Sequence, residues 1–157
     1  MGCEERTAAV ERWGGMVWKL ALARTANIDD AQDIFQEVFL RYFRNEHKLA
    51  DDEHTKAWLI RCTINRAKSR MSSLMKNKAL PLETAERIGV EDDYREVYCS
   101  VLALPIKYRT VVHLYYYEQM SIEQIAAATN CAQGTVKAQL SRARAMLKKS
   151  LKGEIGL

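Results

Sequence analysis

Hydrophobic positions recur along most of the chain at spacings of three and four residues, which is the period of an α-helix. Between residues 12 and 44 this pattern occurs twice, with an interruption at residues 26–30, where Asn27, Asp29 and Asp30 provide turn and N-cap groups. The sequence therefore predicts an antiparallel pair of helices. Residues 55–73 repeat the pattern and predict a third helix.

The second and third of these helices each combine an apolar stripe with a polar face. The apolar stripe expected on the second consists of Ala31, Ile34, Phe35, Val38 and Tyr42. Asp33 and Glu37 then point outward, one turn apart. The buried stripe expected on the third consists of Ala57, Ile60, Ile64, Ala67 and Met71, and its adjoining face carries Arg61, Asn65 and Lys68.

The regular pattern fades after Met75, meets Pro81 and becomes acidic at residues 91–93, which is typical of an interdomain linker. We therefore expect a first domain at residues 1–75, a linker at 76–92 and a second domain at 93–157. The second domain should begin with a helix that ends before Leu104, followed by one from Pro105 to about Glu118. With 48% apolar residues, 7 Gly and only 2 Pro, the predicted fold class is all-α, as two small helical domains joined by a short linker.

Residues 121–151 have the pattern of a helix-turn-helix. Ser121 and Gln124 have the spacing of a capping box, and a short helix should follow from Ile122 to Thr129. Asn130 suits a left-handed turn. The second helix of the motif has a buried stripe made of Val136, Leu140, Ala143 and Leu147.

The other side of this last helix carries small residues between basic ones. Gly134, Ala138, Ser141 and Ala145 form the small lane, which would let the helix approach the major groove of DNA closely. We expect DNA contacts, direct or supporting, from Thr135, Lys137, Gln139, Ser141, Arg142 and Arg144, with Lys148 and Lys149 near the DNA backbone. An amphipathic hairpin with a solvated basic face is the structural alternative.

The positive charge is concentrated in two segments, although the net charge of +4 is mild for a nucleic-acid-binding protein. Residues 54–82 contain seven basic residues and no acid, and residues 121–153 contain six basic residues against Glu123. Two separate phosphate contacts are the natural interpretation. The four cysteines stand singly, without metal-ligand spacing, and no apolar run is long enough to cross a membrane, so we expect free thiols, no metal and a cytoplasmic protein.

The segment from Leu104 to Leu147, with QIAAATNCAQGTVKAQLSRARAMLKK at its centre, resembles region 4 of sigma factors, which recognises the −35 promoter element. DAQDIFQEVFLRYFRN, residues 30–45, resembles sigma region 2.2, which docks on the clamp helices of the largest polymerase subunit. This likeness implies that Asp33, Gln36 and Glu37 contact the polymerase.

KAWLIRCTINRAKSR, residues 56–70, resembles sigma regions 2.3 and 2.4, which open and read the −10 element. The residues that this likeness implies at −10 DNA are Trp58, Arg61, Asn65, Lys68 and Arg70. Aromatic rings and cations are a common means of holding single strands. For Trp58, a place in the core is an equally good interpretation.

The resemblance runs from residue 13 to residue 151 in the order of the family, with no room for regions 1.1 or 3, and is similar to the extracytoplasmic-function (ECF) group of the sigma-70 family. It implies a factor without catalytic activity or cofactor, with core RNA polymerase (clamp helices and flap), promoter DNA and an anti-sigma factor as partners, and without membrane insertion. The main alternative is a stand-alone helix-turn-helix regulator that dimerises through its N-terminal helices. An enzyme acting on nucleic acid has little support, because no phosphate-binding glycine loop is present.

Overall fold

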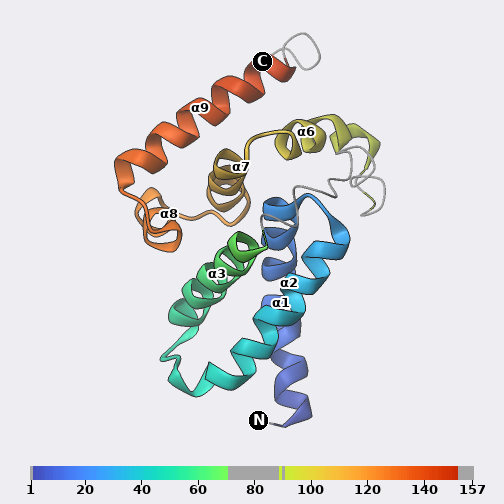
Figure 1. Ribbon diagram of the computed structural model, residues 1–157, viewed down its shortest axis with the longest axis vertical. Coiled ribbons are helices and arrows are strands. Elements are labelled where there is room, and N and C mark those ends of the chain that lie inside the picture. Colours follow the sequence, from blue (N-terminus) through green and yellow to red (C-terminus); the bar gives the residue numbers. More distant parts are fainter. Residues whose placement is uncertain (1, 71–88, 90, 152–157) are drawn as a thin grey trace. The chain divides into compact units, whose positions relative to one another are not determined.

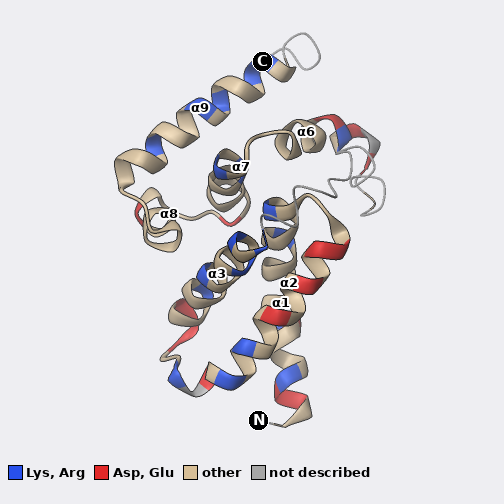
Figure 2. Cartoon of the chain, in the orientation of Figure 1, with Lys and Arg blue, Asp and Glu red and all other residues tan. Residues whose placement is uncertain are grey.

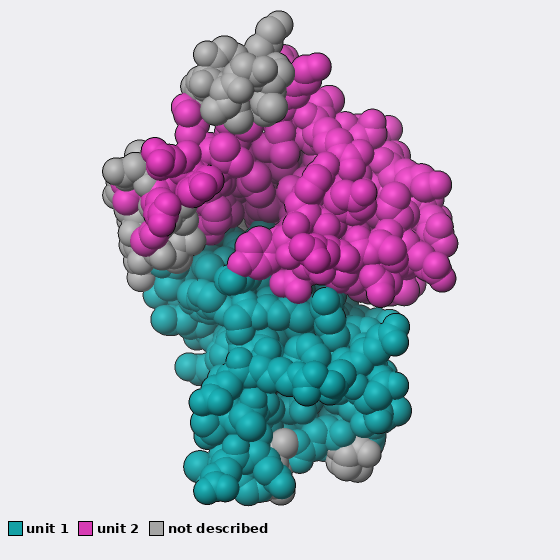
Figure 3. Space-filling model, turned by 180° about the vertical axis from the view of Figure 1, so that it is seen from behind, with its two compact units in different colours: residues 1–77 teal, residues 78–157 magenta. Residues whose placement is uncertain are grey.

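The structure is a computed structural model that describes residues 2–70, 89 and 91–151 of the 157-residue chain. The chain divides into two compact units, residues 1–77 and residues 78–157 (Figure 3), and each is described by itself. Helices make up the regular structure of the described residues, and no strand occurs among them (Figure 1). The all-α fold class is confirmed. Most of the predicted linker, residues 76–88 and 90, lies outside the described part of the chain.

In the first unit, α1 (Cys3–Thr25), α2 (Ile28–Asn45) and α3 (Asp52–Ser69) pack against one another (Figure 1). A short 3₁₀ turn, η1 (Glu46–Lys48), follows α2. The third helix begins at Asp52 rather than Thr55, because the Asp51 side chain accepts a hydrogen bond from the His54 amide (2.8 Å) and caps the helix there. It ends at Ser69, and the expected continuation to residue 73 falls outside the described residues.

The core of this unit follows the predicted apolar stripes of α2 and α3 in part. On α2 the expected Ala31, Ile34 and Val38 are fully buried, whereas Phe35 and Tyr42 are only half-buried, and Phe39, which the pattern did not single out, is buried. On α3 the expected Ile60, Ile64 and Ala67 are buried. Ala57 is only half-buried, however, and Leu59 and Thr63 are buried instead. The buried side of α3 is therefore rotated slightly from the predicted stripe. Met71 lies outside the described residues.

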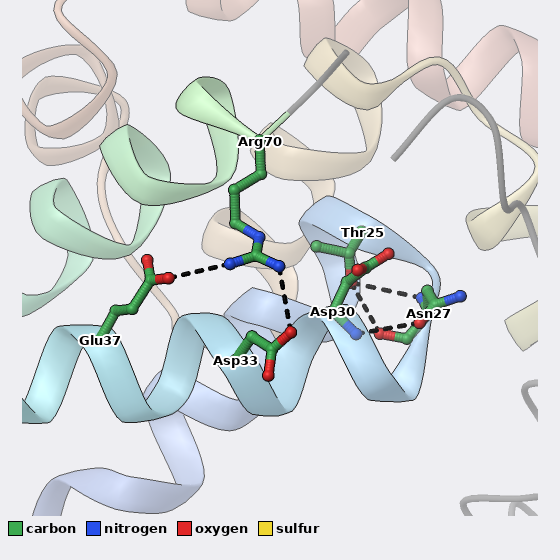
Figure 4. A network of polar contacts seen from close by, with 6 residues as sticks. All are labelled: Thr25, Asn27, Asp30, Asp33, Glu37 and Arg70. Atoms are coloured by element: carbon green, nitrogen blue, oxygen red, sulfur yellow. Dashed lines mark hydrogen bonds and ion pairs between the residues drawn. The ribbon is translucent and has the colours of Figure 1, made fainter. Parts of the chain in front are cut away.

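The turn between α1 and α2 decides where α2 begins. Ala26 ends α1 in the left-handed conformation (φ 52°), and Asn27 caps α2 by accepting a hydrogen bond from the Asp30 amide (3.0 Å). The Thr25 hydroxyl donates to the Ala21 carbonyl (2.9 Å) and also contacts the backbone of Asn27 (Figure 4). These local bonds confirm the predicted turn and fix the direction in which the polar residues of α2 face.

The described part of the second unit contains α6 (Asp92–Leu102), then α7 (Ile106–Val112) and a π-helical turn, η2 (His113–Tyr117). The helix predicted from Pro105 to Glu118 is therefore α7 with η2, and Pro105 is its N-cap. A cluster of Leu104, Tyr108, Val112 and Ala143 joins α7 to the last helix. Arg109 is buried and donates to the Leu102 carbonyl (2.8 Å), so this cation closes the C-terminus of α6.

The predicted helix-turn-helix is present as α8 (Ile122–Thr129) and α9 (Gln133–Leu151). Both bonds of the capping box form: Ser121 Oγ accepts from the Gln124 amide (3.1 Å), and Gln124 Oε1 accepts from the Ser121 amide (2.9 Å). Asn130 takes the left-handed conformation (φ 56°), and so does Gln119 (φ 55°) just before α8. Val136, Leu140 and Ala143 are buried, as their spacing predicts, and Leu147 is half-buried.

The remaining features are the cysteines, the possible metal ligands and the apolar helices. All four cysteines are free, with Cys3 and Cys131 exposed. Within the described ranges, no group of His, Cys, Asp and Glu is arranged to hold a metal ion. No helix there is long and apolar enough to cross a membrane.

Candidate binding surfaces

The first candidate surface lies on α2 and consists of Asp33, Gln36 and Glu37; we call it the α2 surface. Asp33 and Gln36 are exposed and Glu37 is half-buried, while Ile34 and Val38 on the same helix are buried. Along α2 the acidic residues come first and the basic residues follow them (Figure 2). The α2 surface is therefore a compact acidic feature on a helix whose other side belongs to the core.

Arg70 lies against the α2 surface. It caps the C-terminus of α3, and its Nη1 and Nη2 donate to Glu37 Oε1 (2.9 Å) and Asp33 Oδ2 (3.0 Å) respectively (Figure 4). One guanidinium thus joins two carboxylates that stand one turn apart on a neighbouring helix. The family resemblance placed Arg70 with the DNA-facing residues of α3, and the sequence does not identify Asp33 and Glu37 as its partners. We call this pair of contacts the Arg70 fork.

Asp30 belongs to the same electrostatic neighbourhood. Burial raises the pKa of the Asp30 carboxyl above its ordinary value, and the nearby charges of Asp33 and Asp29 act in the same direction. The positive charge of Arg70 opposes them and lowers that pKa. The N-terminal half of α2 therefore concentrates negative charge, and Arg70 offsets part of it.

The second candidate surface lies on α3 and consists of Trp58, Arg61, Asn65 and Lys68; we call it the α3 surface. Their spacings of three, four and three place them on one side of the helix. Arg61, Asn65 and Lys68 are exposed. Arg70 follows Lys68 by two residues, about 200° round the helix axis, so it does not share their side.

The sequence allows Trp58 to be either a core residue or a −10 DNA contact, and its position in the structure has features of both. It is half-buried, and its ring packs against Tyr42 of α2 with a centroid separation of 6.3 Å. The ring is thus anchored to the helical core while part of the side chain stays accessible. This placement fits a fixed aromatic surface at the end of the row formed by Arg61, Asn65 and Lys68.

The third candidate surface is the outer side of α9, which we call the α9 surface: Thr135, Lys137, Gln139, Ser141, Arg142 and Arg144. All of these residues are exposed except Gln139, which is half-buried. The space around Gly134 is open, since a Cβ there would meet no described atom within 4 Å. The first turns of α9 therefore present small residues beside exposed cations, as a helix entering the major groove requires.

Arg144 is held by aromatic residues that sequence spacing did not connect with it. Its Nε donates to the Tyr116 hydroxyl (2.5 Å), and its guanidinium lies 5.5 and 5.6 Å from the ring centroids of Tyr115 and Tyr116. The hydrogen bond that Arg144 donates to Tyr116 is the largest cause of the raised pKa of Arg144. The π-helical turn η2 thus supports one cation of the α9 surface.

Both halves of the chain match known families. Residues 9–76 match Sigma-70 region 2, and residues 94–147 match Sigma-70, region 4. The chain is 28% identical over 141 residues to RNA polymerase sigma factor SigV of Bacillus subtilis, covering 87% of this chain and 85% of that protein. It is 34% identical over 128 residues to the RNA polymerase sigma-E factor of Streptomyces avermitilis, covering 78% of this chain and 71% of that protein.

Two solved structures have the same fold. The sigma factor RpoE of Bartonella quintana, in complex with the anti-sigma factor NepR, superposes with a TM-score of 0.75 at 20% identity, over 96% of this chain and 99% of that one. CnrH in complex with the cytosolic domain of CnrY gives a TM-score of 0.72 at 21% identity, over 98% of this chain and 91% of that one.

A region 2 module followed by a region 4 module defines an RNA polymerase sigma factor. The chain belongs to the ECF group of the sigma-70 family and directs core RNA polymerase to promoters for transcription initiation. A stand-alone helix-turn-helix regulator is not favoured, because the N-terminal helices also match a sigma region over most of their length.

Proposed function

We propose a division of labour among the three surfaces of this sigma factor. The α2 surface docks on the clamp helices of core polymerase through Asp33, Gln36 and Glu37. The α3 surface holds the melted −10 strand through Trp58, Arg61, Asn65 and Lys68. The α9 surface reads the −35 element through the residues that define it, while the second unit also meets the polymerase flap.

The observation that carries this proposal is the separation of charge among exposed helix faces. Asp33 and Glu37 form an acidic feature on α2, whereas the α3 and α9 surfaces contain cations and no carboxylate. Polymerase clamp helices must offer cations to an acidic surface, and DNA offers phosphates to basic ones. One chain with both kinds of surface suits a factor that binds protein and nucleic acid at the same time.

The presence of two binding domains in one chain also affects the affinity of the factor for the promoter complex. When one domain is bound to the polymerase or to DNA, the other is held near its own site at a high effective concentration. Each surface can therefore bind weakly alone and still give a stable promoter complex. The work of this factor is binding and positioning; we propose no catalytic activity for it.

Charge reversal on the α2 surface tests the docking assignment. We expect D33K/E37K to abolish binding to purified core polymerase and runoff transcription from the promoter of the protein's own gene, because it opposes cation to cation. The matched control is E11K, which reverses an exposed acid of α1 outside the surface. Wild-type affinity of D33K/E37K for core polymerase would contradict the assignment.

An anti-sigma factor is the remaining proposed partner. One of the similar structures is a sigma factor bound to an anti-sigma factor, and the other is also a complex with a second protein. We propose that a protein of this kind covers the α2 surface or the α9 surface and so blocks polymerase or DNA. Since its partners are core polymerase and promoter DNA, we place the protein in the cytoplasm. Competition between a co-purifying protein and core polymerase tests this partner.

A further inference from the structure

Among the residues that the structure describes, Arg70 is the cation that pairs with both acids of the α2 surface. Its two terminal nitrogens donate to different carboxylates, Glu37 at 2.9 Å and Asp33 at 3.0 Å (Figure 4). The contact joins the end of α3 to the middle of α2, across more than thirty residues of sequence. The guanidinium suits this task because its planar fork of donors has a fixed geometry.

The fork leaves the acids open to a partner. Arg70 uses one oxygen of each carboxylate, Oε1 of Glu37 and Oδ2 of Asp33, so one oxygen of each remains. The side chains of Asp33 and Glu37 are 56% and 40% exposed, whereas that of Arg70 is only 29% exposed. The acids thus face solvent more than the cation does, and an incoming basic side chain can reach them without displacing Arg70.

The ion pairs of Arg70 also lower two free-energy costs of docking, namely charge repulsion and side-chain ordering. Like charges four residues apart on a helix repel each other, and a guanidinium between them offsets that repulsion. Two flexible carboxylate side chains must otherwise become ordered when the partner arrives, and ordering in advance reduces that entropic cost. The three charges together still leave the cluster negative, so its attraction for cations is preserved.

We propose that Arg70 is a positioning residue of the polymerase-docking surface, which holds Asp33 and Glu37 for the basic side chains of the clamp helices. This inference rests on the docking function proposed for the α2 surface. It also moves Arg70 from the −10 DNA group to the polymerase group, because both of its terminal nitrogens are held by carboxylates, whose negative charges repel a DNA phosphate.

Equilibrium binding of labelled full-length protein to core polymerase, without DNA, tests this role. We expect R70Q to weaken core binding by about three- to tenfold, and R70K to restore part of the loss because an ammonium keeps the charge without the fork. K48Q is the matched control, since it removes an exposed charge on η1, and it should leave affinity unchanged. Unchanged or tighter core binding by R70Q would overturn the inference.

A double-mutant cycle separates positioning from a general loss of stability. If Arg70 acts through Glu37, R70Q should cost less in an E37Q background than in the wild type, because its main partner is already neutral. A purely structural role predicts equal losses in both backgrounds, together with a lower melting temperature for R70Q. Equal losses would overturn the inference.

The same measurements distinguish this inference from the docking assignment. If D33N and E37Q leave core affinity unchanged, the proposed function of the α2 surface fails. If they weaken core binding and R70Q does not, the docking assignment stands and only the role of Arg70 is lost. Binding of a single-stranded −10 oligonucleotide to holoenzyme gives a further check, since R70Q should leave it unchanged once the holoenzyme is saturated.

Discussion

The α2 and α9 surfaces both rely on arginine, and they hold it in different ways. At the α2 surface, Arg70 from the end of α3 forms ion pairs with Asp33 and Glu37, and these contacts hold all three side chains in place. On α9, Arg144 is held by a tyrosine hydroxyl and two aromatic rings, while Lys137 and Arg142 make no ion pair with any described residue. A protein partner offers a few cations at set positions, so its binding site needs fixed acids. DNA offers a continuous row of phosphates, which cations without an internal ion pair are free to meet.

The largest expected effect concerns the two exposed cations of α9, Lys137 and Arg142. We expect K137A/R142A to weaken promoter binding by the holoenzyme about tenfold or more, and to reduce the slope of log affinity against log salt by about two, one for each lost phosphate contact. Affinity for core polymerase should not change, because neither residue lies on the α2 surface. An unaltered salt slope would show that these cations do not meet phosphates, and the contrast between the two surfaces would then disappear.

A smaller effect is expected from the group that holds Arg144. The Y116F variant keeps the ring and removes the hydroxyl that accepts from Nε, so promoter binding should fall about two- to threefold through looser placement of the cation. Y117F is the matched control, since Tyr117 lies on the same turn and is equally exposed. Equal losses in Y116F and Y117F would indicate a general change in η2 rather than the loss of one hydrogen bond.

The second unit should also lose stability at alkaline pH. Burial raises the pKa of Tyr98 to about 12, with Arg109 acting in the opposite direction. A folded-state pKa above the unfolded value of about 10 gives stability that is full below pH 10 and is lost as the pH rises towards 12. Urea midpoints from pH 9 to 11 should fall less steeply for Y98F than for the wild type. Parallel curves would remove Tyr98 as a cause.

The smallest effect is a spectroscopic one on the α2 side. Because the charge of Arg70 lowers the pKa of Asp30, R70Q should raise that pKa further above its ordinary value. Carboxyl carbon shifts followed by NMR through an acid titration report it directly, with K48Q as the comparison. No change at Asp30 would mean that Arg70 lies elsewhere in solution, and the fork would lose its support.

Local chemistry made much of the fold predictable. The capping box of Ser121 and Gln124, the left-handed Asn130 and the bounds of α8 follow from residues close together in sequence. The break at Ala26 and Asn27 is local in the same way. The residues of the α2 and α9 surfaces were expected to face outward, and apart from the half-buried Glu37 and Gln139 they are exposed.

Contacts between helices could not be predicted in this way. The buried Arg109 and the paired contacts of Arg70 each depend on what a neighbouring helix presents. Arg70 and Lys68 look alike in sequence, and only the position of α2 separates their roles. One signal was available: Arg70 breaks the three-four spacing that unites Trp58, Arg61, Asn65 and Lys68. The functional roles of all these residues remain predictions.

Two residues in the left-handed conformation, Gln119 and Asn130, bracket α8. Asparagine tolerates this conformation, whereas a residue such as glutamine pays about 1 kcal/mol for it and glycine does not. Glycine at position 119 should therefore raise the free energy of unfolding. Selection for growth at higher temperature could favour it, and every proposed contact with polymerase and promoter would stay in place. The turn into the DNA-reading motif is thus a site where this protein can adapt its heat resistance separately from its regulon.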